Sequence, residues 1–318
     1  MSGNVSVDSF GETSFGYFVF YVTIFLGISL IIIGGNCVII VTVLRHRDLQ
    51  QPCNYFIASL AASDLVFGII YPIYNLGHLR DSIITRFLAS RVVCEGLITA
   101  VQWIEMNSAY HLVAITVNRY IAIVRPLRYH VYLTSRRAMV TICVIWLTTL
   151  ATSTAIYSTS EKDHGETEAC RYELIFTETQ SIVLTLLSGV IPLSIMVVLY
   201  SIIARIARKH IRDIGACCSS DFLKTGKHHI FWREMRSTLT VSLLVGYFAF
   251  VWIPHCIYIV YSSACQCYIS PYIRLSSRML VYTNNAINIF IYAGRIHLFR
   301  KLAVKDVKQC CSCCYVTK

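Results

Sequence analysis

Seven long apolar runs constrain this fold more than any other feature of the sequence. A helix needs about 20 mostly apolar residues to cross a bilayer, and such runs cover residues 17–44, 54–77, 92–118, 138–158, 181–204, 238–262 and 272–293. Only 14% of the 318 residues are charged, against about a quarter in a soluble domain. Since the runs are continuous and too long for barrel strands, the sequence predicts an all-α membrane protein with a bundle of seven transmembrane helices.

The charged residues indicate how such a bundle is oriented. When the N-terminus is placed outside the cell, most of the 28 Lys and Arg residues fall on the cytoplasmic side, which is the positive-inside bias of membrane proteins. The net charge of +11 is therefore a topology signal with contact to membrane lipid, not a nucleic-acid surface. We expect a multi-pass plasma-membrane protein with an extracellular N-terminus.

The chain divides into three parts. We expect an extracellular N-terminus over residues 1–16, a seven-helix domain over 17–293, and an amphipathic helix with a cytoplasmic tail over 294–318. Because the segments outside the membrane are short, a large protein ligand has little surface to bind. A ligand is expected to be small and to bind between the helices.

Several positions outside the apolar runs are candidates for covalent modification. Asn4 begins a glycosylation sequon on the predicted outer side. Cys94 and Cys170 both fall on that side, where disulfides persist, and whether Cys265 and Cys267 are bridged stays open. The predicted cytoplasmic tail holds Cys310, Cys311, Cys313 and Cys314 beside basic residues, which favours palmitoylation over zinc binding or unmodified thiols.

Polar side chains interrupt the apolar runs at positions where a charge is costly. Asp64 lies near the centre of the second run, and Asn36, Ser108, Asn284 and Asn288 are at similar depth if consecutive helices alternate in direction. A carboxylate among hydroxyl and amide oxygens can bind a small hard cation such as sodium. The alternative is a hydrogen-bond network that holds the helices together, and the residues alone leave both open.

One face of the third run carries polar side chains along its length. Val101, Glu105, Ser108 and Leu112 follow the i, i+4, i+7, i+11 spacing of one helix face, and Arg119 continues it a heptad later. Glu105 on this face can be the counter-ion of a cationic ligand that reaches between the helices. The alternative is a structural glutamate, protonated or hydrogen-bonded to another buried polar side chain.

Two pairings of these charged residues follow as hypotheses. A structural Glu105 would pair with His111 or Tyr282. Arg119 has a candidate partner in Glu234, at the start of the sixth run, and this pair would hold two helix ends together until something separates them. The alternative for Arg119 is an ordinary basic residue of the cytoplasmic side.

Short motifs follow one another along the chain in a fixed order. They are Gly35-Asn36; Asn54-Tyr55-Phe56 with Ser59–Leu65; Asn118-Arg119-Tyr120 with Pro126-Leu127; Trp146; Pro192 with Tyr200; Phe248, Trp252 and Pro254; and Asn288–Tyr292 with Phe299. Together they resemble the rhodopsin-like (class A) G-protein-coupled receptors over nearly the whole chain. The resemblance implies a seven-transmembrane helix bundle with a short amphipathic eighth helix, and a receptor rather than an enzyme.

The resemblance also implies roles for individual residues. It implies no cofactor other than an allosteric sodium ion, which Asp64, Ser108, Asn284 and Asn288 would hold. Arg119 would engage a heterotrimeric G protein once released from Glu234, Trp252 would be the pivot beneath the ligand, Tyr200 and Tyr292 would stabilise the active state, and Cys94 would be bridged to Cys170.

Three departures from the family pattern affect the expected activation mechanism, and one of them is Ala109, which replaces a bulkier core residue near Phe248. Asn118 replaces the usual aspartate, so Arg119 lacks its adjacent counter-charge and Glu234 would be its only lock, which predicts raised basal activity. Ile289 replaces the proline of the NPxxY motif, which predicts a seventh helix that is less kinked there.

The resemblance implies a ligand pocket lined by Val101, Glu105, Tyr172, Glu173, Trp252, His255, Ile259 and Tyr282. The sequence pattern is nearest to that of adenosine receptors, because residues 170–173 resemble their CxFE loop motif. However, Ile259 stands where those receptors have the asparagine that pairs with adenine, and Val101 stands where amine receptors have their ligand-binding aspartate. The predicted ligand is an adenosine-like or cationic small molecule.

Two functions of different classes fit these features. The first is a receptor that binds a small ligand and activates a heterotrimeric G protein. The second is a seven-helix decoy or transporter that binds a ligand without G-protein signalling, which Asn118 and Ile289 favour. A transporter would more commonly show internal repeats and broken helices in both halves, and neither is seen in the sequence. The receptor is the preferred function.

Overall fold

The computed structural model describes residues 15–76, 90–159, 175–216, 226–265, 270–295 and 301–306. Its long helical segments are α1 (Phe15–Arg45), α2 (Pro52–Leu76), α4 (Arg91–Val124), α6 (Ser135–Ser158), α8 (Glu178–Thr185) continued through the π-helical turn η3 (Leu186–Val190) into α9 (Ile191–Ala216), α11 (Gly226–Cys265) and α12 (Pro271–Arg295). These seven segments coincide with the seven predicted apolar runs, so the predicted all-α bundle is confirmed.

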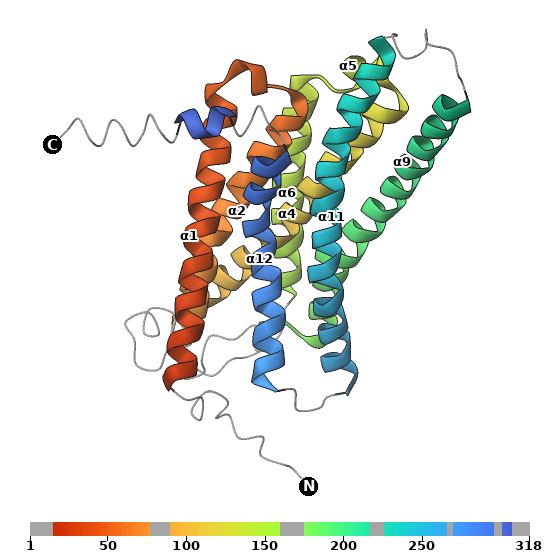
Figure 1. Ribbon diagram of the computed structural model, residues 1–318. Coiled ribbons are helices and arrows are strands. Elements are labelled where there is room, and N and C mark those ends of the chain that lie inside the picture. The colour runs from red at the N-terminus through yellow and green to blue at the C-terminus, as the bar shows by residue number, and fades with distance from the viewer. Residues whose placement is uncertain are drawn as a thin grey trace, which may run out of the picture.

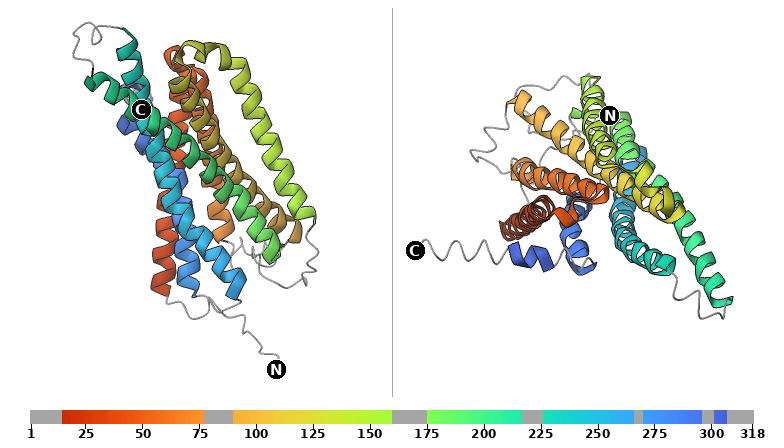
Figure 2. Two further views of the ribbon diagram at one scale, coloured as in Figure 1. Left: turned by 90° about the vertical axis from the view of Figure 1, so that its right-hand side faces the viewer. Right: turned by 90° about the horizontal axis from the view of Figure 1, so that it is seen from above.

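Consecutive long helices run in opposite directions and form a single bundle (Figure 1). We call the end of the bundle where α1 begins the N-terminal face, and the end where α1 finishes the C-terminal face. Helix α4 runs through the middle and packs against α2, α6, α9 and α11 (Figure 2), whereas α12 packs against α1, α2 and α11. Short helices η1 (Arg47–Leu49), η2 (Pro126–Arg128) and α5 (Tyr129–Tyr132) lie in the connections.

The outside of the bundle suits a lipid environment. Large apolar side chains such as Leu30, Leu147 and Phe250 remain exposed there. Helix α6 also exposes threonines, but their hydroxyls are satisfied within the helix: Thr148 donates to the carbonyl of Val144 at 2.7 Å, for example. Such bonds to the preceding turn leave no unsatisfied donor facing the membrane.

Among the described residues, five helical stretches are long and apolar enough to cross a membrane on composition alone: Val22–Arg45, Pro52–Tyr74, Ser135–Ser158, Glu178–Lys209 and Val241–Ser262. The two long helices missing from this set are α4 and α12. These are also the helices that carry Glu105 and Arg119, and Arg278 and Asn284. In α4, polar residues of the bundle interior such as Glu105 lower the hydropathy, whereas the side chains of α12 are described without interruption only over residues 276–290.

Within the described chain, Gly35 and Gly189 are two of the three glycines, with Gly68, at which helices approach unusually closely. A Cβ atom at Gly35 in α1 would lie 2.9 Å from Cγ2 of Ile289 in α12, and a Cβ atom at Gly189 in η3 would lie 2.5 Å from Cε3 of Trp252 in α11. Carbon atoms in contact normally stay about 3.5–4.0 Å apart. Glycine is therefore required at both positions for this packing.

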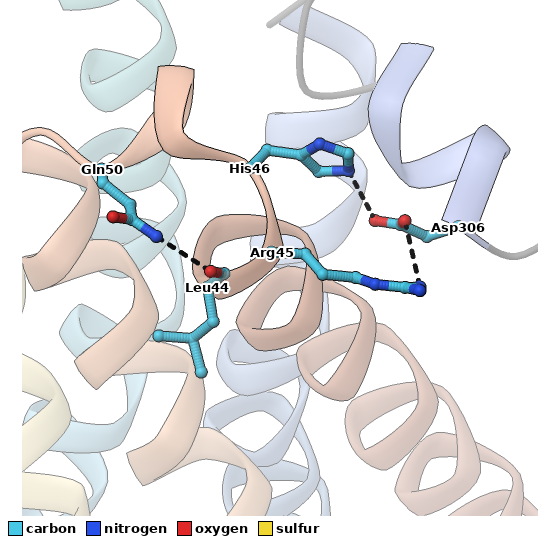
Figure 3. A network of polar contacts seen from close by, with 5 residues as sticks. All are labelled: Leu44, Arg45, His46, Gln50 and Asp306. Carbon is cyan, nitrogen blue, oxygen red and sulfur yellow. Dashed lines mark hydrogen bonds and ion pairs between the residues drawn. The ribbon is translucent and has the colours of Figure 1, made fainter.

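A short helix over residues 301–306, called here the C-terminal helix, lies against the C-terminal face (Figure 1). Ala303 is buried and Leu302 packs against the main core. The Asp306 carboxylate accepts hydrogen bonds from Arg45 Nη1 at 3.4 Å and His46 Nε2 at 3.1 Å (Figure 3). The Arg45–Asp306 ion pair and the His46–Asp306 hydrogen bond thus join this helix to the end of α1.

Candidate functional site

Asp64 lies at the centre of a buried polar cluster between α2, α4 and α12. Its side chain is fully buried. Ser108 Oγ donates to Asp64 Oδ1 at 3.2 Å, and Asn288 Nδ2 donates to Asp64 Oδ2. Asn284 is buried one turn earlier on α12. Three of the four residues predicted for the sodium site are thus joined directly, and the fourth lies on the same helix.

The donor set of this cluster fits a sodium ion. It offers carboxylate, hydroxyl and amide oxygens, which are hard ligands. No group of three His, Cys, Asp or Glu side chains that could hold a metal occurs in the part of the chain that the structure describes. A transition metal is accordingly not favoured at Asp64, whereas one carboxylate with neutral oxygens matches a monovalent ion.

His111 belongs to a second polar chain, which crosses α2, α4 and α6. Trp146 Nε1 donates to Ser59 Oγ at 2.9 Å, and Ser59 Oγ lies 2.8 Å from His111 Nε2. His111 Nδ1 lies 2.8 Å from the carbonyl oxygen of Asn107. Since a carbonyl can only accept, Nδ1 carries the proton, and Nε2 accepts from the serine hydroxyl. Both nitrogens are thereby used, so His111 is not the hydrogen-bond partner suggested for Glu105.

Tyr282 lies on the side of α12 that faces α1 and α2. Its side chain is fully buried and hydrogen-bonds to Ser29. The ring stacks on Phe25 and Tyr71, with centroid separations of 5.0 and 4.8 Å. The hydroxyl is therefore engaged with α1, and Tyr282 is likewise not the partner suggested for Glu105.

Trp252 and His255 lie on the inward side of α11. Trp252 is buried, stacks on Phe248 at 5.4 Å between ring centroids, and meets the edge of His255 at 5.7 Å. His255 Nδ1 lies 2.8 Å from the hydroxyl oxygen of Ser277 in α12. Ile259, one turn beyond His255, is half-buried. These predicted pocket residues thus share one stretch of α11 that leads from Trp252 toward the N-terminal face.

Val101 and Glu105 lie on α4 in the same half of the bundle. Val101 is buried in an apolar cluster that includes Phe176, just before α8. Glu105 is surrounded by protein but keeps part of its surface accessible. Tyr172 and Glu173, also predicted for the pocket, lie outside the described residues.

Arg278 in α12 was not singled out by the sequence analysis. Its guanidinium interacts electrostatically with both Glu105 and His255, so a cation accompanies the carboxylate in this part of the bundle. Arg278 directly follows Ser277, whose hydroxyl contacts His255.

The C-terminal face carries the residues predicted for the activation switch. Arg119 is buried and interacts electrostatically with the Tyr200 hydroxyl. The neighbouring Asn118 accepts a hydrogen bond from the Tyr129 hydroxyl at 2.9 Å, which ties α5 to α4. Glu234 and Tyr292 belong to α11 and α12, but their side chains are outside what the structure describes. The Arg119–Glu234 pair stays a prediction.

The candidate modification sites are only partly covered by the structure. Cys94, near the start of α4, forms a disulfide, and its predicted partner Cys170 lies outside the described residues. Asn4, Cys267, Cys310, Cys311, Cys313 and Cys314 also lie outside them, and Cys265 is described only as the last residue of α11.

Comparisons with known proteins agree on one family. Residues 35–292 match the model of a family described as 7 transmembrane receptor (rhodopsin family). The octopamine receptor beta-2R of Chilo suppressalis is 25% identical over 99% of this chain and 86% of its own length. The human adenosine receptor A2a is 28% identical, with coverages of 91% and 72%, and the melanocortin receptor 4 of Danio rerio is 26% identical, with coverages of 92% and 84%. This chain therefore belongs to the rhodopsin family of seven-transmembrane receptors, and it is a membrane receptor rather than an enzyme.

Proposed function

We propose that this receptor binds a small extracellular ligand between its helices and thereby activates a heterotrimeric G protein. The observation that carries the proposal is the line of polar residues along α4. Glu105, Ser108 and Arg119 lie on this one helix, and Ser108 is hydrogen-bonded to the buried Asp64 between the other two. A central helix with this arrangement links a ligand site in one half of the bundle to Arg119 at the C-terminal face.

The ligand site of this proposal lies between α4, α11 and α12. Its members are Val101, Glu105, Trp252, His255 and Ile259. Tyr172 and Glu173, which come before α8 in the chain, complete the set. Tyr282 takes part by holding α12 against α1 and α2, since its ring stacks on Phe25 and Tyr71. Glu105 supplies a negative charge for a cationic group of the ligand.

Sodium binding at Asp64 is part of the same proposal. The carboxylate, Ser108, Asn284 and Asn288 would hold the ion, which supplies a positive charge opposite a buried carboxylate. The hydrogen bonds from Ser108 and Asn288 to Asp64 support this placement because they bring a hydroxyl and a side-chain amide to the carboxylate. They equally support the alternative of a hydrogen-bond network without an ion.

We place the N-terminus outside the cell, which makes the C-terminal face cytoplasmic. In this orientation Asn4 is available for glycosylation, Cys94 is bridged to Cys170, and Cys310, Cys311, Cys313 and Cys314 are palmitoylated at the inner surface. The basic residues Arg45, Arg47, Lys301 and Lys305 are exposed at the C-terminal face. Exposed basic side chains at the inner surface suit contact with anionic lipid.

Guanine-nucleotide exchange on a panel of purified G proteins tests the proposal. Membranes with the wild-type receptor should accelerate exchange, either basally or with a member of a small-molecule panel. Arg119→Ala should abolish this acceleration at equal receptor amounts, while Arg136→Ala, which changes an exposed arginine near the same face, should preserve it.

The rival function is a seven-helix decoy or transporter. Specific ligand binding without nucleotide exchange on any G protein, basal or stimulated, would support the rival and defeat the receptor proposal. Accelerated exchange that Arg119→Ala leaves intact would defeat the proposed role of Arg119 alone.

A further inference from the structure

The connection between α4 and α6, which lies at the C-terminal face (Figure 1), presents a surface rich in arginine. Its exposed arginines are Arg125, Arg128, Arg136 and Arg137. The sequence has no Asp or Glu between Glu105 and Glu161, so this stretch of chain supplies no carboxylate of its own. The positive charge of the segment therefore favours an anion placed on it.

Tyr132, the last residue of α5, lies among these arginines. Its side chain is 38% exposed. Arg125 Nη1 donates to the phenolic oxygen at 3.1 Å, and the guanidinium carbon of Arg125 lies 5.7 Å from the centre of the tyrosine ring. Hydrogen bonds from Arg128 and from Arg125 lower the pKa of Tyr132 below its ordinary value. The phenolic oxygen is thus a point on which donors from two arginines converge.

Contacts with both neighbouring helices hold the segment around Tyr132 in place. Tyr129, at the start of α5, donates to Asn118 Oδ1 in α4 at 2.9 Å. In α6, Arg137 Nη1 donates to the carbonyl oxygens of Val131 at 2.7 Å and Tyr132 at 3.2 Å. These contacts fix α5 at both of its ends, so the phenol of Tyr132 is presented at a defined place beside the end of α4.

The two tyrosines of α5 use their hydroxyls differently. Tyr129 is half-buried and donates its proton to Asn118, whereas the oxygen of Tyr132 accepts from Arg125. An acceptor that already receives arginine donors gains when it becomes an anion, because charge-assisted hydrogen bonds are roughly twice as strong as neutral ones. A phosphoryl group on a tyrosine brings three such acceptor oxygens and a charge of about −1.5 to −2.

We propose, resting on the orientation proposed above in which the C-terminal face is cytoplasmic, that Tyr132 is a tyrosine-phosphorylation site whose phosphate is held by Arg125 and Arg128. In the transfer, the phenolic oxygen bonds to the γ-phosphorus of ATP, the bond from that phosphorus to the bridging oxygen breaks, ADP leaves, and the phenolic proton passes to the base of the kinase. The phosphate then replaces the phenol as the acceptor for both guanidinium groups. Since α5 is attached to Asn118, the neighbour of Arg119, the modification acts beside the residue proposed to engage the G protein.

The first test locates phosphate on the purified receptor in lipid nanodiscs. The receptor is incubated with ATP, Mg²⁺ and each member of a panel of soluble tyrosine-kinase domains, and modified residues are identified by mass spectrometry. At least one kinase should modify Tyr132 at about 10-fold or more the occupancy of Tyr129, because release of Tyr129 requires breaking its hydrogen bond to Asn118. Tyr132→Phe should remove most of the phosphate that this kinase incorporates. No modification of Tyr132 by any kinase, or equal occupancy of the two tyrosines, would overturn the proposal.

The second test measures whether the arginines hold the phosphate. The second pKa of a phosphotyrosine is about 6, and nearby positive charges favour the dianion, so ³¹P NMR titration of the modified wild type should give a lower pKa. Arg125→Gln/Arg128→Gln should raise this pKa by about 1, while Arg136→Gln, an exposed arginine of the same surface, should leave it near the wild-type value. Incorporation of phosphotyrosine during translation supplies any variant that the kinase does not accept. The same pKa in the wild type and the double variant would refute the role of the two arginines.

The orientation on which the proposal rests has its own measurement. In sealed right-side-out membrane vesicles, added kinase and ATP should label Tyr132 only after the vesicles are permeabilised. Labelling of intact vesicles would place the C-terminal face outside the cell and would overturn a role for cytosolic kinases. The receptor function fails by a separate result, since nucleotide exchange by the wild type and by Arg119→Ala is compared without any phosphate on the receptor.

Discussion

Gly189→Ala is the substitution whose effect can be worked most directly from the structure. The new Cβ would lie 2.5 Å from Cε3 and 2.9 Å from Cζ3 of Trp252, and 3.3 Å from Sγ of Cys256. Ordinary carbon contacts are about 3.5–4.0 Å, so the indole or the η3 turn must move by roughly 1 Å. Overpacking of this kind costs about 1–3 kcal/mol.

The matched control is Gly246→Ala in α11. A Cβ there meets nothing within 4 Å, so the substitution adds only the helix preference of alanine over glycine, a gain of up to about 1 kcal/mol. Comparing the two alanine variants separates the clash from this common gain. We expect Gly189→Ala to be less stable than Gly246→Ala by about 1–3 kcal/mol. Each kcal/mol of lost stability should lower the melting temperature by on the order of 2–4 °C.

The assay is thermal unfolding of purified receptor, followed by basal nucleotide exchange on the same samples. Since the clash involves Trp252 and spares the cluster around Asp64, basal exchange should change in Gly189→Ala and remain at the wild-type rate in Gly246→Ala. Equal melting temperatures for the two variants, together with equal exchange, would refute the argument that Gly189 is required for the position of Trp252.

Three further predictions concern other contacts. Replacing sodium by choline in the buffer should lower the melting temperature of the wild type but not of Asp64→Asn, which lacks the carboxylate for the ion; an equal response of both would contradict the sodium site. Tyr129→Phe leaves the buried Asn118 acceptor without its donor and should lower receptor stability by about 1–3 kcal/mol in thermal unfolding. Asp306→Asn removes the charge that faces His46; since the ion pairs are partly exposed, stability should fall by less than about 1 kcal/mol, while trypsin should cleave the C-terminal helix faster.

The helices could be predicted well because lipid leaves the backbone few choices. Within a bilayer every backbone amide must be satisfied inside its own segment or a closed barrel, so continuous apolar runs such as 17–44 and 138–158 predict helices by length alone. The predicted alternation of helix direction also placed Ser108 and Asn288 at the depth of Asp64, and the structure joins them.

Side-chain partners inside the bundle were harder to predict. Which neighbour a buried residue faces depends on the rotation of each helix and on the order of helices around α4, and neither is encoded in spacing along one helix. For this reason His111 was suggested as a partner of Glu105, whereas it hydrogen-bonds toward Ser59 on α2. Arg278 was not predicted, because spacing along one helix does not show which helix its side chain faces.

Two of the departures from the family pattern, Asn118 and Ile289, each have a local structural counterpart. Asn118 is neutral, yet it still accepts a hydrogen bond from Tyr129, so α5 remains attached to α4 without a carboxylate. Ile289 fills the position of a proline, and the absence of a side chain at Gly35 gives its branched side chain room against α1. These contacts keep the helices packed around Arg119 and Asn288 without the aspartate and the proline of the family pattern.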